Sequence, residues 1–257
     1  MHILVYEYLT GGGHGPTYPA SMRLEGERMV EALVSDLIAI PGVHISLLWD
    51  VTHPFLPVSS DRIRCIPIAP SEDPLEVIQN TLAKVDAVWP VAPETNGTLE
   101  RICRMIEDHH KTLLNADSSS VSLTASKQRT HDALKHAGIP VVPTRPVEAI
   151  AKWSEVPYPC VLKMDDGAGC EDTIIIRERT SVEDCRINHP SGSWVVQPLI
   201  KGSALSLSGL FFKGSAQLLC CNHQHIQIDQ DRFHLTGIKV NAASDPDGTM
   251  ALSLIHI

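Results

Sequence analysis

Lys163 is the residue of this chain whose type and surroundings point most clearly to chemistry. It follows a short apolar run, residues 159–162, and precedes a loop that contains Gly167 and Gly169. A second run, residues 173–176, is rich in β-branched side chains. A lysine and several bare backbone N–H groups between two strands can converge on a polyphosphate. The sequence therefore predicts a nucleotide site at a strand–loop–strand hairpin, and not at a glycine loop that feeds a helix.

Two further segments carry groups suited to such a ligand. Lys127 is expected in the first turn of a helix, where it could reach a phosphate, although a surface lysine is the ordinary interpretation. The segment Gln197-Pro198-Leu199-Ile200 has the form of a strand that turns sharply at its proline. Its backbone and apolar side chains could line a slot for an adenine edge. The alternative is an ordinary edge strand that ends in a turn.

A glycine-rich loop at residues 11–15 follows the first expected strand. Its spacing fails the GxGxxG pattern because the third glycine would fall on Pro16 or on Tyr18, which disfavours a nicotinamide-dependent Rossmann enzyme. A flexible turn is the simpler interpretation, but ligands of open α/β sheets bind at this end of the strands. The candidate substrate contacts at this edge are Glu7, Gly12, Gly13 and Glu94.

Alternating polar residues occur near the end of the second half. Cys221, His223 and His225 would share one face of a strand. Three residues on one strand are too widely spaced to bind one ion without distortion, so no metal site is predicted here. Asn222 and Gln224 would point to the other face and are candidates for polar contacts with substrate or nucleotide.

Composition excludes several functional classes. The 257 residues are 43% apolar and 20% charged, as in globular proteins of one or two domains. A net charge of −9 disfavours a nucleic-acid partner. No signal peptide or membrane-length apolar stretch is visible. The seven cysteines form no CxxC pair, which indicates a reducing cytoplasm.

The first half alternates strand and helix patterns. Such alternation predicts a Rossmann-like α/β domain, residues 1–117, with a parallel sheet and helices on both faces. Strands are expected at 3–8, 43–49, 63–68, 86–91 and 112–115, and helices at 22–40, 75–84 and 97–110.

The pattern changes near Asp117, and residues 118–257 are expected to form an α+β domain. One capped helix is predicted at 123–137. A small subdomain at about 118–192 would contain the Lys163 hairpin, and a larger one would begin at residue 193. Its strands are expected at 194–197, 205–212, 216–221 and 226–228.

Together, Ser126-Lys127, residues 163–171 and residues 197–200 resemble the ATP-grasp family, with the N-terminal domain as the pre-ATP-grasp part. Residues 5–13 and 92–97 resemble the branch of that family that includes tyramine–glutamate ligase of methanofuran biosynthesis. Bacterial relatives of that branch are linked to one-carbon cofactor pathways. The similarity covers about residues 1 to 250.

The resemblance implies an ATP-dependent ligase that joins a small-molecule carboxylate to an amine through an acyl phosphate, with glutamate as one possible substrate. Lys127 and Lys163 would hold the phosphates of ATP, and residues 197–200 would line the adenine slot. The loop at 165–171, with Asp166, would fold over the phosphates. No residue is singled out as catalytic, and a homo-oligomer is compatible with the sequence.

The chain departs from the family near its end. ATP-grasp enzymes bind Mg²⁺ through an acidic residue and a later Glu-x-Asn pair, and no Glu-x-Asn follows Lys201. We therefore expect the Mg²⁺ ligands beyond Ile257, a C-terminally truncated ATP-grasp domain, weak nucleotide binding and no turnover by this chain. The alternative is a non-catalytic nucleotide-binding or regulatory module.

Overall fold

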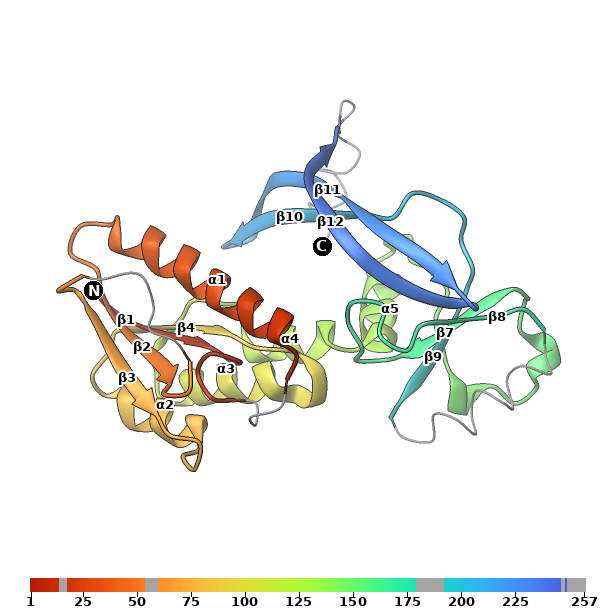
Figure 1. Ribbon diagram of the computed structural model, residues 1–257. Helices are drawn as coiled ribbons and strands as arrows, with labels where there is room; N and C mark the ends of the chain where they lie inside the picture. The colour runs from red at the N-terminus through yellow and green to blue at the C-terminus, as the bar shows by residue number, and fades with distance from the viewer. Residues whose placement is uncertain (14–17, 54–59, 179–191, 246–247, 249–257) are drawn as a thin grey trace. The chain divides into compact units, whose positions relative to one another are not determined.

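The computed structural model describes residues 1–13, 18–53, 60–178, 192–245 and 248 (Figure 1). The chain divides into two compact units, Met1–Leu123 and Thr124–Ile257. The boundary expected near residue 117 lies at the start of a helix, where the Asp117 carboxylate accepts a hydrogen bond from the Ser120 N–H at 2.8 Å. The change of pattern in the sequence thus coincides with a helix cap.

The first unit is built on a five-stranded sheet in the order β3-β2-β1-β4-β5, in which all pairs of strands are parallel. Its strands are β1 (His2–Glu7), β2 (His44–Asp50), β3 (Ile63–Ile68), β4 (Ala87–Val91) and β5 (Thr112–Leu113). Its helices are α1 (Ala20–Ile38), α2 (Pro74–Leu82), η1 (Thr95–Gly97), α3 (Thr98–Asp108) and α4 (Ser118–Thr124). The predicted parallel α/β organisation is confirmed.

Strand β1 lies in the middle of this sheet and is buried on both faces. Ile3 and Val5 pack against α1, whereas Leu4 and Tyr6 pack against α2 and α3. Successive side chains of a strand point to opposite faces, so a continuous apolar run fits a sheet covered by helices on both sides.

The second unit is built on a seven-stranded sheet in the order β10-β11-β12-β8-β7-β9-β6, with antiparallel pairing. Its strands are β6 (Arg145–Pro146), β7 (Cys160–Met164), β8 (Ile174–Ile176), β9 (Trp194–Pro198), β10 (Leu205–Phe212), β11 (Ser215–Asp229) and β12 (Arg232–Ala243). Its helices are α5 (Lys127–His136), η2 (Val147–Ala149) and η3 (Trp153–Glu155). The predicted α+β class is confirmed.

Two details of the expected second half are wrong. The single helix at 123–137 is divided into α4 and α5, because the Ser126 hydroxyl accepts a hydrogen bond from the Arg129 N–H and begins a new helix. The strands at 216–221 and 226–228 form one strand, β11. The polar residues between them interrupt the apolar pattern without interrupting the backbone pairing.

Strand β12 was not expected at all. It is joined to β11 by the two-residue turn Gln230-Asp231, in which both residues have positive φ, 46° and 62°. Such hairpin turns usually contain Asn or Gly, so the sequence Gln230-Asp231 does not predict a hairpin turn. Residues 246–247 and 249–257, near the end of the chain, lie outside the described residues. Within the described ranges, none of the helices combines the length and apolar character that crossing a membrane requires.

Candidate functional site

A cavity of about 420 Å³ lies over one face of the second unit's sheet, and β7 and β9 form much of its floor. In β7, Cys160 and Leu162 point into the apolar core, so Val161 and Lys163 point to the cavity. In β9, Gln197 is paired with Val161 and faces the same way. Antiparallel register therefore places an ammonium and an amide on the same face, diagonally across the β7–β9 pair.

Lys163 is a half-buried cation that faces this cavity. Its ammonium forms no hydrogen bond or ion pair with any residue that the structure describes. Burial lowers the pKa of Lys163, the nearby Lys127 ammonium lowers it further, and Cys170 opposes the shift. A partly desolvated cation beside a second one is unfavourable unless an anion neutralises it, so this position could bind a phosphate.

Lys127, the first residue of α5, has its ammonium engaged by the loop that follows β7. It donates to the backbone carbonyls of Met164 at 2.9 Å, Asp165 at 3.1 Å and Gly167 at 2.6 Å. Burial lowers its pKa, and Asp165 and Asp166 oppose that shift. Lys127 lines the same cavity as Lys163, but in this structure its ammonium is used in hydrogen bonds to these backbone carbonyls.

The same loop is tied to the start of α5 by a second set of contacts. The Asp165 carboxylate accepts a hydrogen bond from the Gln128 N–H at 2.8 Å, and its carbonyl accepts one from the Lys127 N–H at 3.1 Å. Gly167 and Gly169 line the cavity, whereas Asp166 lies outside its lining. Gly169 has a φ of +61°, a left-handed conformation that favours glycine.

The segment 197–200 forms one wall of the cavity, together with apolar residues from distant elements. Strand β9 lies between β7 and β6, so the alternative of an edge strand is wrong. Pro198 has no N–H, and the Leu199 N–H donates to the Pro159 carbonyl at 3.2 Å. The Ile200 N–H has no partner in the described part of the chain. The apolar residues that join this wall are Val142, Ala204, Ile226 and Phe233.

Asn222 and Gln224 were both candidates for polar contacts with substrate or nucleotide, and the two side chains have different surroundings in the structure. Gln224 lines the cavity, whereas Asn222 is buried and lies outside its lining. The Asn222 amide donates to the Ser208 hydroxyl at 3.1 Å and accepts from the Asn241 N–H at 3.1 Å. Asn222 therefore ties β11 to the two strands beside it.

Among the described residues, the histidines of β11 belong to no group placed to hold a metal ion. The rings of His223 and His225 lie 5.3 Å apart, and Cys221 is buried. Among the residues described, no group of three or more His, Cys, Asp and Glu side chains is placed to hold a metal ion.

The sequence reasoning missed several residues that line the cavity. Phe233 comes from β12, and the alternation of Phe233 and Leu235 with polar residues was the available signal for that strand. Val142 and Ala204 lie in irregular segments, and no local sequence pattern predicts that they line a cavity. Their positions depend on long-range packing.

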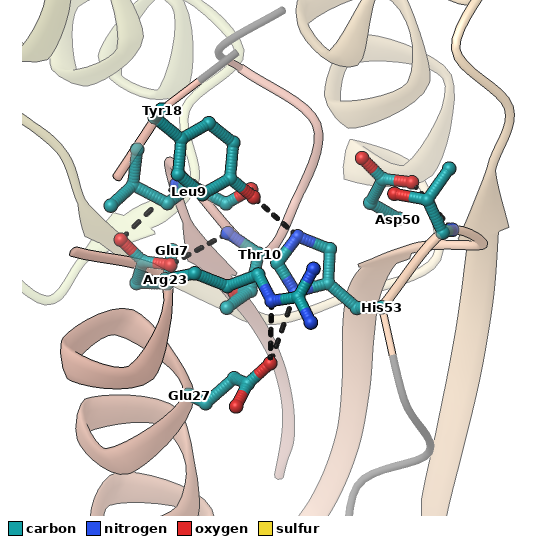
Figure 2. A network of polar contacts seen from close by, with 9 residues as sticks. Glu7, Leu9, Thr10, Tyr18, Arg23, Glu27, Asp50 and His53 are labelled. Carbon is teal, nitrogen blue, oxygen red and sulfur yellow. Dashed lines mark hydrogen bonds and ion pairs between the residues drawn. The ribbon is translucent and has the colours of Figure 1, made fainter. Parts of the chain in front are cut away.

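Glu7 of the first unit is buried, with 3% of its surface exposed, and lies next to Leu9 and Thr10 (Figure 2). Its carboxylate accepts hydrogen bonds from the N–H groups of Leu9 at 3.2 Å and Thr10 at 2.8 Å. Gly12 has a φ of +81°. A Cβ on Gly13 would lie 2.4 Å from the Tyr8 ring, so this position has no room for a side chain. Glu7 shapes the loop through its hydrogen bonds to Leu9 and Thr10.

A second set of polar contacts connects Leu9, Tyr18, His53 and Glu27. The Tyr18 hydroxyl lies 2.5 Å from His53 Nε2 and 3.4 Å from the Leu9 carbonyl (Figure 2). His53 Nδ1 lies 3.3 Å from the Glu27 carboxylate. Glu94 is exposed at the start of η1, and Gly15 lies outside the described residues. Of the four candidates at this edge, Glu94 is the exposed acidic side chain.

The contact between Glu7 and α1 predicts a specific sensitivity at Gly26. A Cβ on Gly26 would lie 2.6 Å from the Glu7 carboxylate, so Gly26→Ala is expected to lower the free energy of unfolding by about 1–3 kcal/mol. Helix propensity alone would favour alanine by about 1 kcal/mol. Chemical denaturation measures the difference, and Ser35→Ala on the exposed side of α1 is the control. A Gly26→Ala chain as stable as the control would contradict the tight contact.

The lowered pKa of Lys163 predicts a pH dependence of phosphate binding. Only the ammonium attracts phosphate, so affinity for ADP is expected to fall as pH rises through this pKa, at a lower pH than for an exposed lysine. The free energy of unfolding without nucleotide should instead rise with pH over the same range. The unfolded chain keeps the Lys163 proton to a higher pH than the folded chain, in which burial disfavours the charge. Calorimetric titration with ADP between about pH 7 and pH 10 measures the loss of affinity. Lys163→Arg should remove most of this pH-dependent loss of affinity. Equal pH profiles for the two chains would contradict a phosphate contact by Lys163.

Two protein-family models match the chain. A pre ATP-grasp 3 domain matches residues 43–121, and an ATP-grasp domain matches residues 124–253. No curated protein matches the sequence.

Solved structures show the same fold at low sequence identity. L-amino acid ligase from Bacillus licheniformis is 15% identical with a TM-score of 0.66, over 100% of this chain and 59% of that chain. N5-carboxyaminoimidazole synthetase from Staphylococcus aureus, complexed with ADP, is 13% identical with a TM-score of 0.67, over 99% and 62%. D-alanine–D-alanine ligase from Bacillus anthracis, complexed with ATP, is 13% identical with a TM-score of 0.61, over 99% and 75%. The chain spans less than two thirds of the first two proteins.

Proposed function

Because this chain belongs to the ATP-grasp family, we propose that the cavity over β7 and β9 binds ATP and that the whole protein is a carboxylate–amine ligase. The observation that carries the proposal is the Lys163 ammonium, half-buried in the cavity and without a hydrogen-bonding partner among the described residues. A triphosphate would supply the missing anion. The apolar wall around residues 197–200 would receive the base.

The described residues fit a nucleotide in three respects. Lys163 offers a charge-assisted hydrogen bond to phosphate. Gly167 and Gly169 let backbone approach the phosphates closely, and Lys127 holds that loop in place. The Ile200 N–H and the Gln197 amide supply polar groups in an otherwise apolar wall. No acidic cluster for Mg²⁺ is found in the described ranges, so no ligand of that ion is assigned.

The proposed reaction proceeds in two balanced steps. A carboxylate oxygen attacks the γ-phosphorus of ATP, and the bond between that phosphorus and the bridging oxygen of the β-phosphate breaks. ADP departs, and an acyl phosphate is formed. The amine then attacks the acyl carbon, the carbon–oxygen bond breaks, and phosphate leaves with a carboxylate oxygen as the amine loses a proton. The contribution of this chain is to position the phosphates and neutralise their charge.

Two finer parts of the proposal, glutamate as one substrate and a place in one-carbon cofactor biosynthesis, rest on the sequence resemblance of residues 5–13 and 92–97. A cytoplasmic location rests on the cysteine pattern, and a homo-oligomeric state is compatible with the sequence. An amino acid substrate is in keeping with the L-amino acid ligase among the similar folds. Glu94, exposed at the sheet edge, is the acidic side chain that could meet an amine there.

An isotope experiment tests the reaction. With the whole protein, ATP, an amine and a carboxylate labelled with ¹⁸O, mass spectrometry should find one ¹⁸O in the released phosphate and an amide product. Lys163→Met is the control and should release much less labelled phosphate at the same ATP concentration. Nucleotide binding without turnover on any pair of amino acid and amine would instead support the non-catalytic module. Phosphate released without label would contradict the acyl phosphate.

A further inference from the structure

The side-chain amide of Gln197 is oriented by a buried chain of hydrogen bonds. Its Nε2 lies 2.8 Å from the Thr144 hydroxyl oxygen, and that oxygen lies 3.0 Å from the Val142 carbonyl. His131 Nδ1 lies 2.9 Å from the same carbonyl. Thr144 and His131 are both buried, so water does not compete for these contacts.

The position of each proton follows from donor and acceptor chemistry. A carbonyl only accepts, so the Thr144 hydroxyl and His131 Nδ1 must both donate to Val142. The single hydroxyl proton of Thr144 is thereby used, and its oxygen can only accept from Gln197. The amide must therefore turn its NH₂ toward Thr144, because the reversed amide would require the same hydroxyl proton twice.

The consequence appears on the cavity side. Because Thr144 holds the NH₂ of Gln197, the Oε1 atom of Gln197 is available as an acceptor. This oxygen accepts no hydrogen bond from the residues described. Gln197 lines the cavity opposite Val161, beside the wall formed by 198–200. A fixed acceptor at the base wall favours a donor on the ligand.

We propose that Thr144 and His131 are positioning residues that lock the Gln197 amide so that the cavity selects a purine with an exocyclic amine over a 6-oxo purine. This inference rests on the proposed nucleotide site and deepens it. Adenine would present its N6–H to Oε1. Hypoxanthine and guanine would present a carbonyl oxygen to the same acceptor, leaving two buried acceptors face to face, an unsatisfied pair that binding sites reject.

ADP and IDP form the sharpest pair of probes, because their bases differ at the 6-position, where IDP has an oxygen and a protonated N1. Calorimetry on the whole chain should give at least about tenfold tighter binding of ADP than of IDP. Thr144→Val keeps the branched shape and removes the hydroxyl, so the amide can reverse and offer its NH₂ to a 6-oxo group. We expect IDP to bind more tightly and ADP more weakly, which brings the ratio to within about threefold of unity.

Thr144→Ser is the matched control, because it retains the hydroxyl and should retain the preference for ADP. A purely structural role of Thr144 would weaken both nucleotides equally, and that result would overturn the inference. Equal binding of ADP and IDP by the unaltered chain would also overturn it, while leaving the nucleotide site intact. If neither nucleotide binds, or if both bind Lys163→Met as tightly as the unaltered chain, the proposed function itself fails and the inference with it. A circular dichroism melt shows that each variant is folded.

Discussion

Replacing Lys163 by methionine is expected to weaken ATP binding by about 30- to 150-fold, because a charge-assisted hydrogen bond to phosphate contributes about 2–3 kcal/mol. Methionine keeps a long apolar side chain over the cavity floor and removes the charge. The same change should leave the stability of the nucleotide-free chain unchanged or raise it, since Lys163 is a desolvated cation beside Lys127.

Calorimetric titration with ATP and a thermal melt without nucleotide measure the two effects separately. Lys163→Arg keeps the charge and should retain part of the affinity. A methionine variant that melts well below the unaltered chain would mean that Lys163 is structural. A variant with unchanged ATP affinity would mean that the phosphates lie elsewhere.

Lys127→Met is expected to have the opposite effect on stability. Its ammonium holds the carbonyl of Met164 at the end of β7 and two carbonyls of the loop that follows, and the loss of these hydrogen bonds should lower the free energy of unfolding by about 1–3 kcal/mol. ATP affinity should fall by about tenfold, because the loop that approaches the phosphates is no longer held in place.

Amide hydrogen exchange distinguishes this role from direct phosphate binding. Exchange at Gly167 and Gly169 should become faster in Lys127→Met without nucleotide, and Lys163→Met should leave it unchanged. Lys127→Arg is the conservative control for the loop contacts. Unaltered loop exchange in Lys127→Met, together with a loss of ATP affinity, would show that Lys127 acts on the phosphates alone.

The parts of this site that the sequence predicted are those set by local periodicity. Lys163 faces the cavity because it is two residues after Val161 on one strand, and such alternation is visible in the sequence. The central position of β1 and the helices on both faces of its sheet follow in the same way from an apolar run and from alternating elements.

The parts that could not be predicted depend on contacts between distant residues. Lys127 meets the carbonyls of a loop about forty residues away, and Thr144 orients Gln197 across the β6–β9 pairing. Glu7 has the form of a surface acid in the sequence, and only the turn of residues 8–13 shows that its carboxylate is used internally. Register and burial of this kind are not encoded in any one segment.

The position of the Lys163 ammonium relative to bound nucleotide tests the central claim most directly. A crystal structure of the chain with ADP should place Nζ of Lys163 within about 3 Å of a phosphate oxygen, with the base against residues 197–200. ADP bound at another surface, or a Lys163 ammonium turned to bulk solvent while ADP occupies the cavity, would contradict the account.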